Sequence, residues 1–288
     1  MAETKEILSL TPETEPNPDP DPLNEFRLHL ENQGKSPNTI RAYLFAVRQF
    51  NTIYKELTHE NLMLYKCHLI EHYKPQTVNL RIRAVNSYME FMKKSDSKVL
   101  MVRFQHKSFV ENVISQADYE YLLNCLQRDG KMTYYFMVRI MATTGLRVSE
   151  LIQLTAEDIS NGYIDLYSKG NRMRRVYIPK AVRTECLQWL ASLGRVTGPV
   201  FLNRMGHPIT PAGIRDQFKS FTSRYGLDPS VVYPHSFRHL FAKNFIEHCD
   251  DISMLSDILG HESIETTRIY LRKTSTEQKQ IFNQVVNW

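Results

Sequence analysis

Apolar residues recur at helical spacing in four stretches of the first third of the chain. Ser36 and Pro37 are typical of an N-cap and a first helical turn, and they open the second stretch. The predicted helices run from Leu23 to beyond Leu30, from Pro37 to Phe50, from about Glu60 to His72, and from about Gln76 to Met92. Four short helices with one apolar face each predict a small bundle.

The helical period is lost over residues 93–108, where five basic residues collect, so we predict a basic linker between two domains. Beyond it helices predominate again. They are expected near residues 116–126, 133–144, 180–193, 211–225, 236–248, 252–259 and 264–270. Residues 163–168 and 172–178 alternate around Lys169-Gly170-Asn171, which predicts a β hairpin. The expected fold class is mainly α with a small β hairpin, in two domains.

The first 22 residues differ from the rest of the chain. They hold six acidic residues against Lys5 alone, and residues 11–22 (TPETEPNPDPDP) alternate proline with acidic and polar residues. Such a segment cannot bury enough apolar surface to fold, so a disordered acidic leader is expected. At 288 residues the chain exceeds the usual size of one domain. We therefore expect a leader (1–22), a first domain (23–93), a linker (94–110) and a second domain (111–288).

The net charge of +5 hides a strongly basic body. Residues 23–288 carry 35 basic and 25 acidic side chains, and residues 23–107 alone carry 14 and 7. An excess of this kind is typical of proteins that bind a polyanion, although a basic surface also simply keeps a protein in solution. The candidate DNA-binding residues are Arg41, Arg81, Arg83, Lys94, Lys98 and Arg103. For Arg81 and Arg83, a solvated helix face is an equally good interpretation.

Several classes of protein are excluded. The longest apolar runs are far too short to span a bilayer, and the N-terminus lacks a secretory signal, so we expect a cytoplasmic protein without a membrane partner. The four cysteines lie about 60 residues apart, which fits neither a zinc site nor a disulfide framework, and we interpret them as buried thiols. The chain also lacks the glycine-rich nucleotide motifs, so no nucleotide cofactor is expected.

Three motifs in the second half carry candidate chemistry. TGLRVSEL (144–151) places Arg147 among apolar neighbours after a glycine helix stop, HSFRH (235–239) places a histidine and an arginine one helical turn apart, and LGHESIETTRIY (259–270) joins a histidine to a tyrosine. His235 and His239 have a spacing that zinc ligands also use, but no glutamate occupies the position a metalloprotease needs. We therefore expect no metal site.

In their order and separation, these motifs and the hairpin SKGNRMRRVYIP (168–179) resemble the tyrosine site-specific recombinases of the phage integrase family, in particular its compact Xer-like members. The resemblance covers residues 23–288. It implies a two-domain DNA clamp, with a SAM-like core-binding bundle and a catalytic domain that ends in an exchange helix. The residues that it implies are catalytic are Arg147, Lys169, His235, Arg238, His261 and Tyr270, with Glu150 as structural support.

The chemistry of these residue types agrees with the resemblance. Charge grows on phosphate oxygens during phosphoryl transfer, and two arginines can stabilise it with paired hydrogen bonds. Tyr270 would attack and form a 3′-phosphotyrosine, while Lys169 protonates the departing sugar oxygen. Because the covalent link keeps the bond energy, the reaction needs neither metal nor nucleotide, and the expected cofactor is none.

The expected function is therefore site-specific recombination of double-stranded DNA by way of a Holliday junction, for integration, excision or resolution. A type IB topoisomerase-like enzyme and a catalytically inactive DNA-binding relative are the alternatives. The resemblance also implies a tetramer on DNA. An apolar stripe near the C-terminus needs a cover, either on its own domain or on a neighbouring protomer. The stripe consists of Ile281, Phe282, Val285 and Val286, with Trp288 at the end of the chain.

Overall fold

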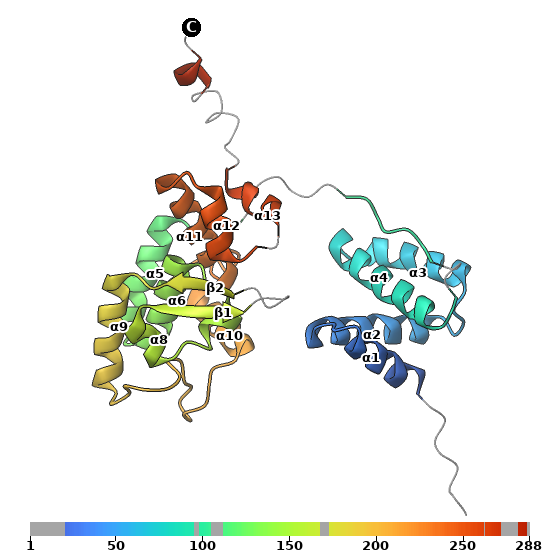
Figure 1. Ribbon diagram of the computed structural model, residues 1–288, viewed down its shortest axis with the longest axis horizontal. Coiled ribbons are helices and arrows are strands. Elements are labelled where there is room, and N and C mark those ends of the chain that lie inside the picture. The colour runs from blue at the N-terminus through green and yellow to red at the C-terminus, as the bar shows by residue number, and fades with distance from the viewer. Residues whose placement is uncertain are drawn as a thin grey trace, which may run out of the picture. The chain divides into compact units, whose positions relative to one another are not determined.

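The computed structural model describes residues 21–94, 98–104, 112–167, 173–261, 263–271 and 282–286. The chain divides into two compact units, residues 1–106 and residues 107–288 (Figure 1). Both units are mainly helical, and the strands among the described residues form one two-stranded sheet. The expected fold class is thus confirmed. No helix in the described ranges is long and apolar enough to cross a membrane.

The first unit is a bundle of four helices, as expected: α1 (Pro22–Asn32), α2 (Pro37–Ile53), α3 (His59–His72) and α4 (Pro75–Phe91). Its core is built from the apolar positions that gave the helical period, among them the fully buried Phe26, Phe50 and Ile82. Ser36 caps α2, since its hydroxyl accepts a hydrogen bond from the backbone of Thr39.

Two residues of the expected leader belong to this bundle instead. The carboxylate of Asp21 accepts a hydrogen bond from the backbone N–H of Leu23, which makes it the N-cap of α1. Pro22 is the first helical residue, where its missing N–H costs nothing. Residues 1–20 of the expected leader lie outside the described residues.

Residues 98–104, which the sequence places in the linker, pack along α4. The side-chain amide of Asn86 bonds both the N–H and the C=O of Val99, at 3.1 and 2.8 Å. Asn79 binds Val102 in the same two-fold manner, at 2.7 and 2.9 Å. These amides satisfy an extended backbone that has no strand partner there, and Val99 is buried in the core of the bundle. This part of the segment is therefore a component of the first unit.

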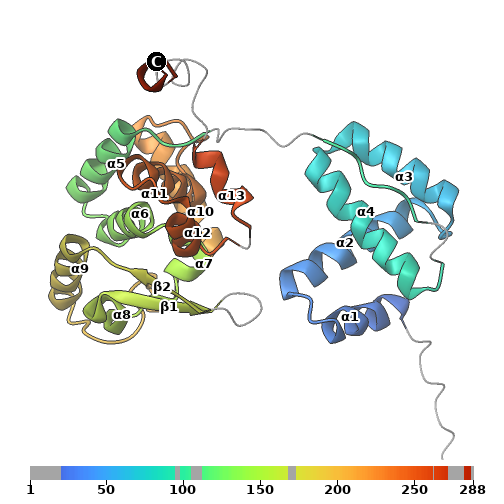
Figure 2. The ribbon, with the colours of Figure 1, turned by 45° about the horizontal axis from the view of Figure 1, so that its top comes forward.

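The second unit contains the remaining elements. Its helices are α5 (Gln116–Arg128), α6 (Met132–Thr144), α7 (Val148–Leu151), α8 (Ala156–Asn161), α9 (Lys180–Ser192), α10 (Pro211–Tyr225), α11 (Pro234–His248), α12 (Ile252–Leu259) and α13 (Glu265–Arg268), followed by the 3₁₀ helix η2 (Ile269–Leu271). Most of α6 is buried, and it packs against α5, α9 and α11. It is the central helix of the unit (Figure 2). The hairpin, α8 and α9 lie on one side of it, and α11 and α12 lie on the other.

Strands β1 (Tyr163–Tyr167) and β2 (Met173–Tyr177) form the predicted antiparallel hairpin. Ile164 pairs with Val176, and Leu166 pairs with Arg174, so these four side chains share one face of the sheet. Ile164, Leu166 and Val176 on this face are buried in the core. Arg174 is therefore a charged side chain on the covered face of the hairpin.

The structure corrects the sequence analysis at two further points. Helices α7 and α8 were not predicted, because four and six residues are too few to show a helical period. Cys125 and Cys186 are buried as expected, whereas Cys67 is exposed and Cys249 only partly covered. Cys67 lies on the solvent side of α3, where the local apolar pattern is weak.

Candidate active site

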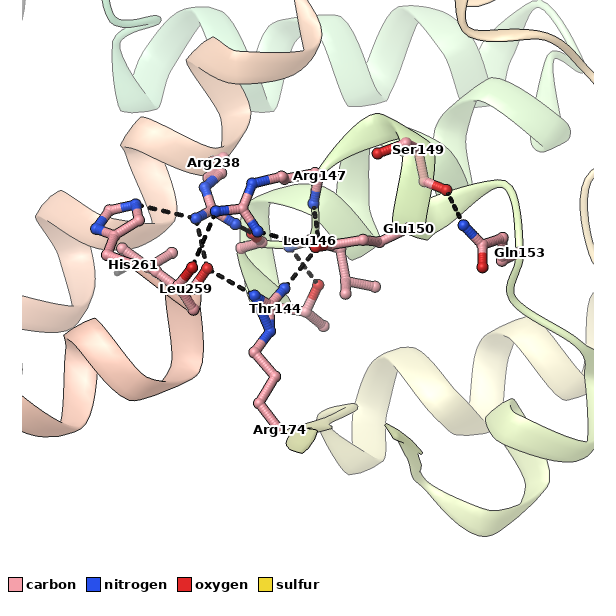
Figure 3. Close-up of polar contacts among 12 residues, drawn as sticks. Thr144, Leu146, Arg147, Ser149, Glu150, Gln153, Arg174, Arg238, Leu259 and His261 are labelled. Atoms are coloured by element: carbon pink, nitrogen blue, oxygen red, sulfur yellow. Dashed lines mark hydrogen bonds and ion pairs between the residues drawn. The ribbon is translucent and has the colours of Figure 1, made fainter. Parts of the chain in front are cut away.

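Three arginine side chains converge on the carboxyl end of α12 (Figure 3). Arg238 of α11 and Arg174 of β2 each donate a hydrogen bond to the carbonyl of Leu259, both at 2.7 Å. Arg147, the N-cap of α7, donates to the carbonyl of Gly260 at 3.2 Å. The last carbonyls of a helix have no partner within the helix, and they carry its partial negative charge. The end of α12 therefore holds the three guanidinium groups.

Arg238 also links α12 to the central helix. Its second terminal nitrogen donates to the carbonyl of Gly145, at 2.5 Å, where α6 ends in a left-handed glycine cap. The side chain is almost fully buried. Burial and the charge of Arg147 lower the pKa of Arg238 to about 9, which still leaves it charged at neutral pH. Two backbone carbonyl groups, those of Gly145 and Leu259, thus hold this buried cation.

Glu150 connects the other two arginines. One carboxylate oxygen binds Arg147 at 2.9 Å, and the other binds both Arg174, at 2.7 Å, and the backbone N–H of Arg147. Burial opposes the ionisation of this carboxyl, but these donors outweigh it and lower the pKa of Glu150. Glu150 therefore links the side chains of Arg147 and Arg174 to each other.

The pocket keeps an excess of positive charge. Among the described residues, the three guanidinium groups bind one carboxylate, that of Glu150, and otherwise backbone carbonyl groups and the neutral ring of His261. Three cations and one anion suit a ligand that brings negative charge, and guanidinium groups bind phosphate with paired hydrogen bonds. The arrangement can therefore bind a phosphodiester and stabilise the charge that grows on it during transfer.

His261, which follows α12, is held in one tautomer. Its Nε2 lies 3.1 Å from a terminal nitrogen of Arg238, and its Nδ1 lies 2.8 Å from the hydroxyl of the buried Thr267. Because an arginine N–H can only donate, Nε2 must accept, and the proton of the neutral ring is on Nδ1. Burial and the nearby arginines lower the pKa of His261 to about 4, so the ring is neutral at pH 7.

Tyr270 lies on η2, and its hydroxyl contacts α11. Oη is 2.5 Å from Nδ1 of His239, and the two rings have their centroids 5.7 Å apart. Burial raises the pKa of Tyr270 to about 12, against the opposing charge of Arg238. The phenol of the free protein is therefore protonated, and an attack on phosphorus requires an acceptor for its proton.

The remaining predicted site residues divide into two groups. His235 lies on the same helix as Arg238, and the loss of solvent around its ring together with the charges of Arg238 and Arg147 lowers its pKa. His235 keeps an exposed surface, unlike its helix neighbour Arg238. Lys169 lies outside the described residues, and its role stays a prediction. The structure thus brings together Arg147, Glu150, Arg238 and His261, with His235 and Tyr270 on elements that pack beside them.

The six candidate DNA-binding residues all belong to the first unit. Arg41, Arg83, Lys94 and Arg103 are exposed, and Lys98 pairs with Glu90 at 3.0 Å. Arg81 differs from the others, because its guanidinium stacks 3.9 Å above the ring of Tyr73 and donates to Gln49 at 2.7 Å. These internal contacts stabilise the bundle, so a phosphate contact by Arg81 would come in addition to a structural role.

Arg174 and His239 are site residues that the motif analysis missed. Strand alternation could have indicated Arg174, because it lies two residues before the buried Val176 and therefore on the same face of β2. The sequence indicated His239 only as a possible zinc ligand, because its contact with Tyr270 joins residues 31 positions apart. No three His, Cys, Asp or Glu side chains in the described ranges are grouped as a metal site requires.

Gly260 has no room for a side chain. It adopts a left-handed conformation with φ of +62°, and a Cβ atom there would lie 2.0 Å from Nη1 of Arg174. Gly260→Ala is expected to displace Arg174 and, through Glu150, Arg147. We predict a loss of DNA cleavage of about 10²-fold or more, since cationic donors to a transition state have effects of this size.

Gly226→Ala is the matched control for this substitution. Gly226 also ends a helix with a left-handed φ of +67°, but nothing lies within 4 Å of its Cβ position. Both variants lose about 1–2 kcal/mol through the backbone conformation, and Gly260→Ala should melt at a still lower temperature because it also displaces Arg174. Equal cleavage by the two variants would mean that Arg174 does not support the site.

Comparison with known proteins agrees with this geometry. Residues 112–277 match the model of the phage integrase family, and residues 23–98 match that of the phage integrase N-terminal SAM-like domain. Tyrosine recombinase XerD of Halalkalibacterium halodurans is 29% identical over 288 residues, covering 90% of this chain and 95% of the relative. Tyrosine recombinase XerA of Pyrococcus furiosus is 27% identical over 265 residues, covering 90% and 91%.

Solved structures share the fold. The Tn1549 transposon integrase in complex with a circular intermediate DNA has a TM-score of 0.71 at 16% identity, covering 92% of this chain and 99% of that one. The XerH site-specific recombinase bound to its difH substrate has a TM-score of 0.69 at 19% identity, covering 92% and 84%. Because the family match spans more than half of the residues and includes the pocket described above, the chain belongs to the phage integrase family, as a tyrosine recombinase of the Xer-like type.

Proposed function

We propose that this protein carries out site-specific recombination of duplex DNA with Tyr270 as the nucleophile. One observation carries the proposal: helix η2, where Tyr270 lies, packs against α11. The same helix α11 places Arg238 in the arginine cluster and His239 next to the tyrosine hydroxyl. Oη of Tyr270 bonds to phosphorus, and the bond from phosphorus to the 5′ oxygen breaks. The products are a 3′-phosphotyrosine and a free 5′ hydroxyl.

The other site residues have separate roles in this step. Arg147 and Arg238 bind the non-bridging phosphate oxygens and stabilise their growing charge. His261 has its Nε2 directed at Arg238, and the neutral ring orients that guanidinium. His235, which is exposed on the helix that carries Arg238, is available to bind phosphate or to pass a proton, and Lys169 protonates the departing 5′ oxygen. Attack by a second 5′ hydroxyl reverses the chemistry and rejoins the strand, so no outside energy source is needed.

Double-stranded DNA is the proposed substrate. Solved relatives with this fold include a XerH recombinase bound to difH and a λ integrase bound to a core site. In this chain, the basic residues of the first unit and the cationic pocket of the second suit a phosphate backbone. Strand exchange between two sites by way of a Holliday junction is the outcome we expect from paired cleavage and rejoining.

The experiment uses the protein to find its own site. Genomic fragments retained by the Tyr270→Phe variant are sequenced, and the recovered site is built into nicked duplexes that release a short strand after cleavage. Such substrates should trap the wild-type protein as an adduct that survives SDS, also in EDTA. A lack of any adduct on a duplex that the protein binds specifically would contradict the proposed function.

We also propose that the protein acts as a tetramer on DNA, with the C-terminal stripe docked on a neighbouring copy. Residues 282–285 are helical, and Phe282 and Val285 are 63% and 61% exposed. Large apolar side chains on one short helix favour a covered position in the working assembly. Ile281 and Trp288, the other large members of the stripe, lie outside the described residues.

Substitution of this stripe is expected to separate binding from synapsis. Phe282→Ser with Val285→Ser should leave binding to a single half-site unchanged, because both side chains are exposed. Cooperative binding of the second copy and strand exchange should fall by about tenfold or more, which is the loss of roughly 1.4 kcal/mol of apolar contact. Leu193→Ser, at a residue 51% exposed elsewhere in the unit, is the control. Full cooperativity in the double variant would place the stripe outside any interface.

A further inference from the structure

His239 contacts the hydroxyl of Tyr270, although none of the roles proposed above uses it. Its Nδ1 lies 2.5 Å from Oη of Tyr270. His239 is on α11, directly after Arg238, and α11 packs against η2, which carries Tyr270. A phenol that bonds to phosphorus must give up its proton. The structure thus places a ring nitrogen at hydrogen-bond distance from the atom that has to lose it.

We propose that His239 is a catalytic residue of the cleavage step, in which its Nδ1 accepts the proton of Tyr270 as Oη bonds to phosphorus. The inference rests on the proposed role of Tyr270. The O–H bond of the phenol breaks while a bond from Nδ1 to that proton forms, and the oxygen's electrons form the bond to phosphorus. The bond to the 5′ oxygen breaks, and that oxygen takes a proton from a separate acid, the role proposed for Lys169. In rejoining, His239 returns its proton to Tyr270.

The surroundings of His239 keep it ready to accept. The titratable groups that face this pair are His235 and Arg238 on α11, Tyr233 just before it, and His261 after α12. Burial is the largest cause of a lowered pKa at His239, and the electrostatic effects of His235 and Arg238 add to it. Together they lower the pKa of His239 to about 4. At neutral pH the ring therefore has one nitrogen without a proton, and the protonated Tyr270 is a donor for it.

The two pKa values also determine when the proton moves. With Tyr270 at about 12 and His239 at about 4, full transfer before attack is strongly unfavourable. The phenol becomes far more acidic as its oxygen bonds to phosphorus, so transfer accompanies that bond. A docked phosphodiester also brings negative charge next to the ring, which favours the imidazolium that forms. General base catalysis of this kind contributes about 10²–10⁴-fold.

A simple positioning role would need only a hydrogen bond. Asparagine has its side-chain amide near the position of Nδ1 and can accept or donate a hydrogen bond there, but it cannot take a proton at neutral pH. His239→Asn therefore separates the two roles. His248→Asn is the matched control, because His248 lies on the same helix, is exposed and bonds a backbone carbonyl.

The experiment measures single-turnover cleavage of a nicked duplex between pH 6 and 8.5. In the wild type, neither His239 nor Tyr270 changes protonation in this range. In His239→Asn the attack needs prior loss of the phenol proton, whose extent rises tenfold per pH unit. At pH 7 we expect His239→Asn to cleave about 10²-fold or more slowly than the wild type. The ratio of the wild-type rate to the variant rate should fall as the pH rises.

Replacing Tyr270 by difluorotyrosine, a more acidic phenol, should shrink the deficit of His239→Asn further. A rate for His239→Asn within about threefold of the wild type, or a deficit that is the same at every pH and with both phenols, would overturn the proposal. If His239→Asn fails to bind DNA, His239→Gln gives the same comparison. An adduct in the wild type with no deficit in either variant rejects the role of His239 and leaves the proposed function intact.

Discussion

Tyr270→Phe is expected to abolish the covalent adduct with DNA and to leave DNA binding unchanged. Phenylalanine keeps the ring that packs between η2 and α11 and removes only the hydroxyl. The lost hydrogen bond to His239 should cost about 1 kcal/mol of stability. Gel shifts and SDS gels on the nicked duplex measure binding and adduct separately. Tyr225→Phe, which removes a hydroxyl bonded to Asp129 elsewhere in the unit, should cleave normally. An adduct in Tyr270→Phe would assign the nucleophile to another residue.

Arg238→Lys is expected to lower the cleavage rate by about 10³-fold or more. The guanidinium spans the carbonyls of Gly145 and Leu259 and also contacts His261. An ammonium group has no planar fork, so it cannot maintain these contacts and also bind phosphate with two parallel hydrogen bonds.

Arg139→Lys is the control for this loss. Arg139 is also largely covered, but it pairs with Glu185 and Tyr135, away from α12. Its substitution should lower the melting temperature without a comparable loss of cleavage in protein that is still folded. A similar rate loss in the two variants would show that general destabilisation, and not the position of Arg238, limits cleavage.

The helical framework was predictable because its signals are local. Long amphipathic helices such as α2 repeat their apolar positions over several turns, and Ser36 with Pro37 marks where α2 begins. The hairpin followed from alternation around Lys169-Gly170-Asn171. Short α7 has no such period, yet it places both Arg147 and Glu150. Its position depends on its capping contacts and on α12, which lies more than 100 residues away.

The candidate site was predictable as residue types, but its contacts were not. The motifs named Arg147, Arg238, His261 and Tyr270, and the structure gathers the first three around the end of α12. No local pattern shows that carbonyls of one helix end hold three arginines. The role of Gly260 follows from the approach of Arg174, a contact between β2 and the residue after α12. Both depend on tertiary packing.

The chemical identity of the trapped adduct tests the central claim most directly. Wild-type protein is trapped on the nicked duplex, digested with nuclease and trypsin, and analysed by mass spectrometry. The account predicts a nucleotide joined through its 3′ phosphate to the oxygen of Tyr270, in the tryptic peptide of residues 269–272. A nucleotide attached to any other residue, or joined through a 5′ phosphate, would contradict it.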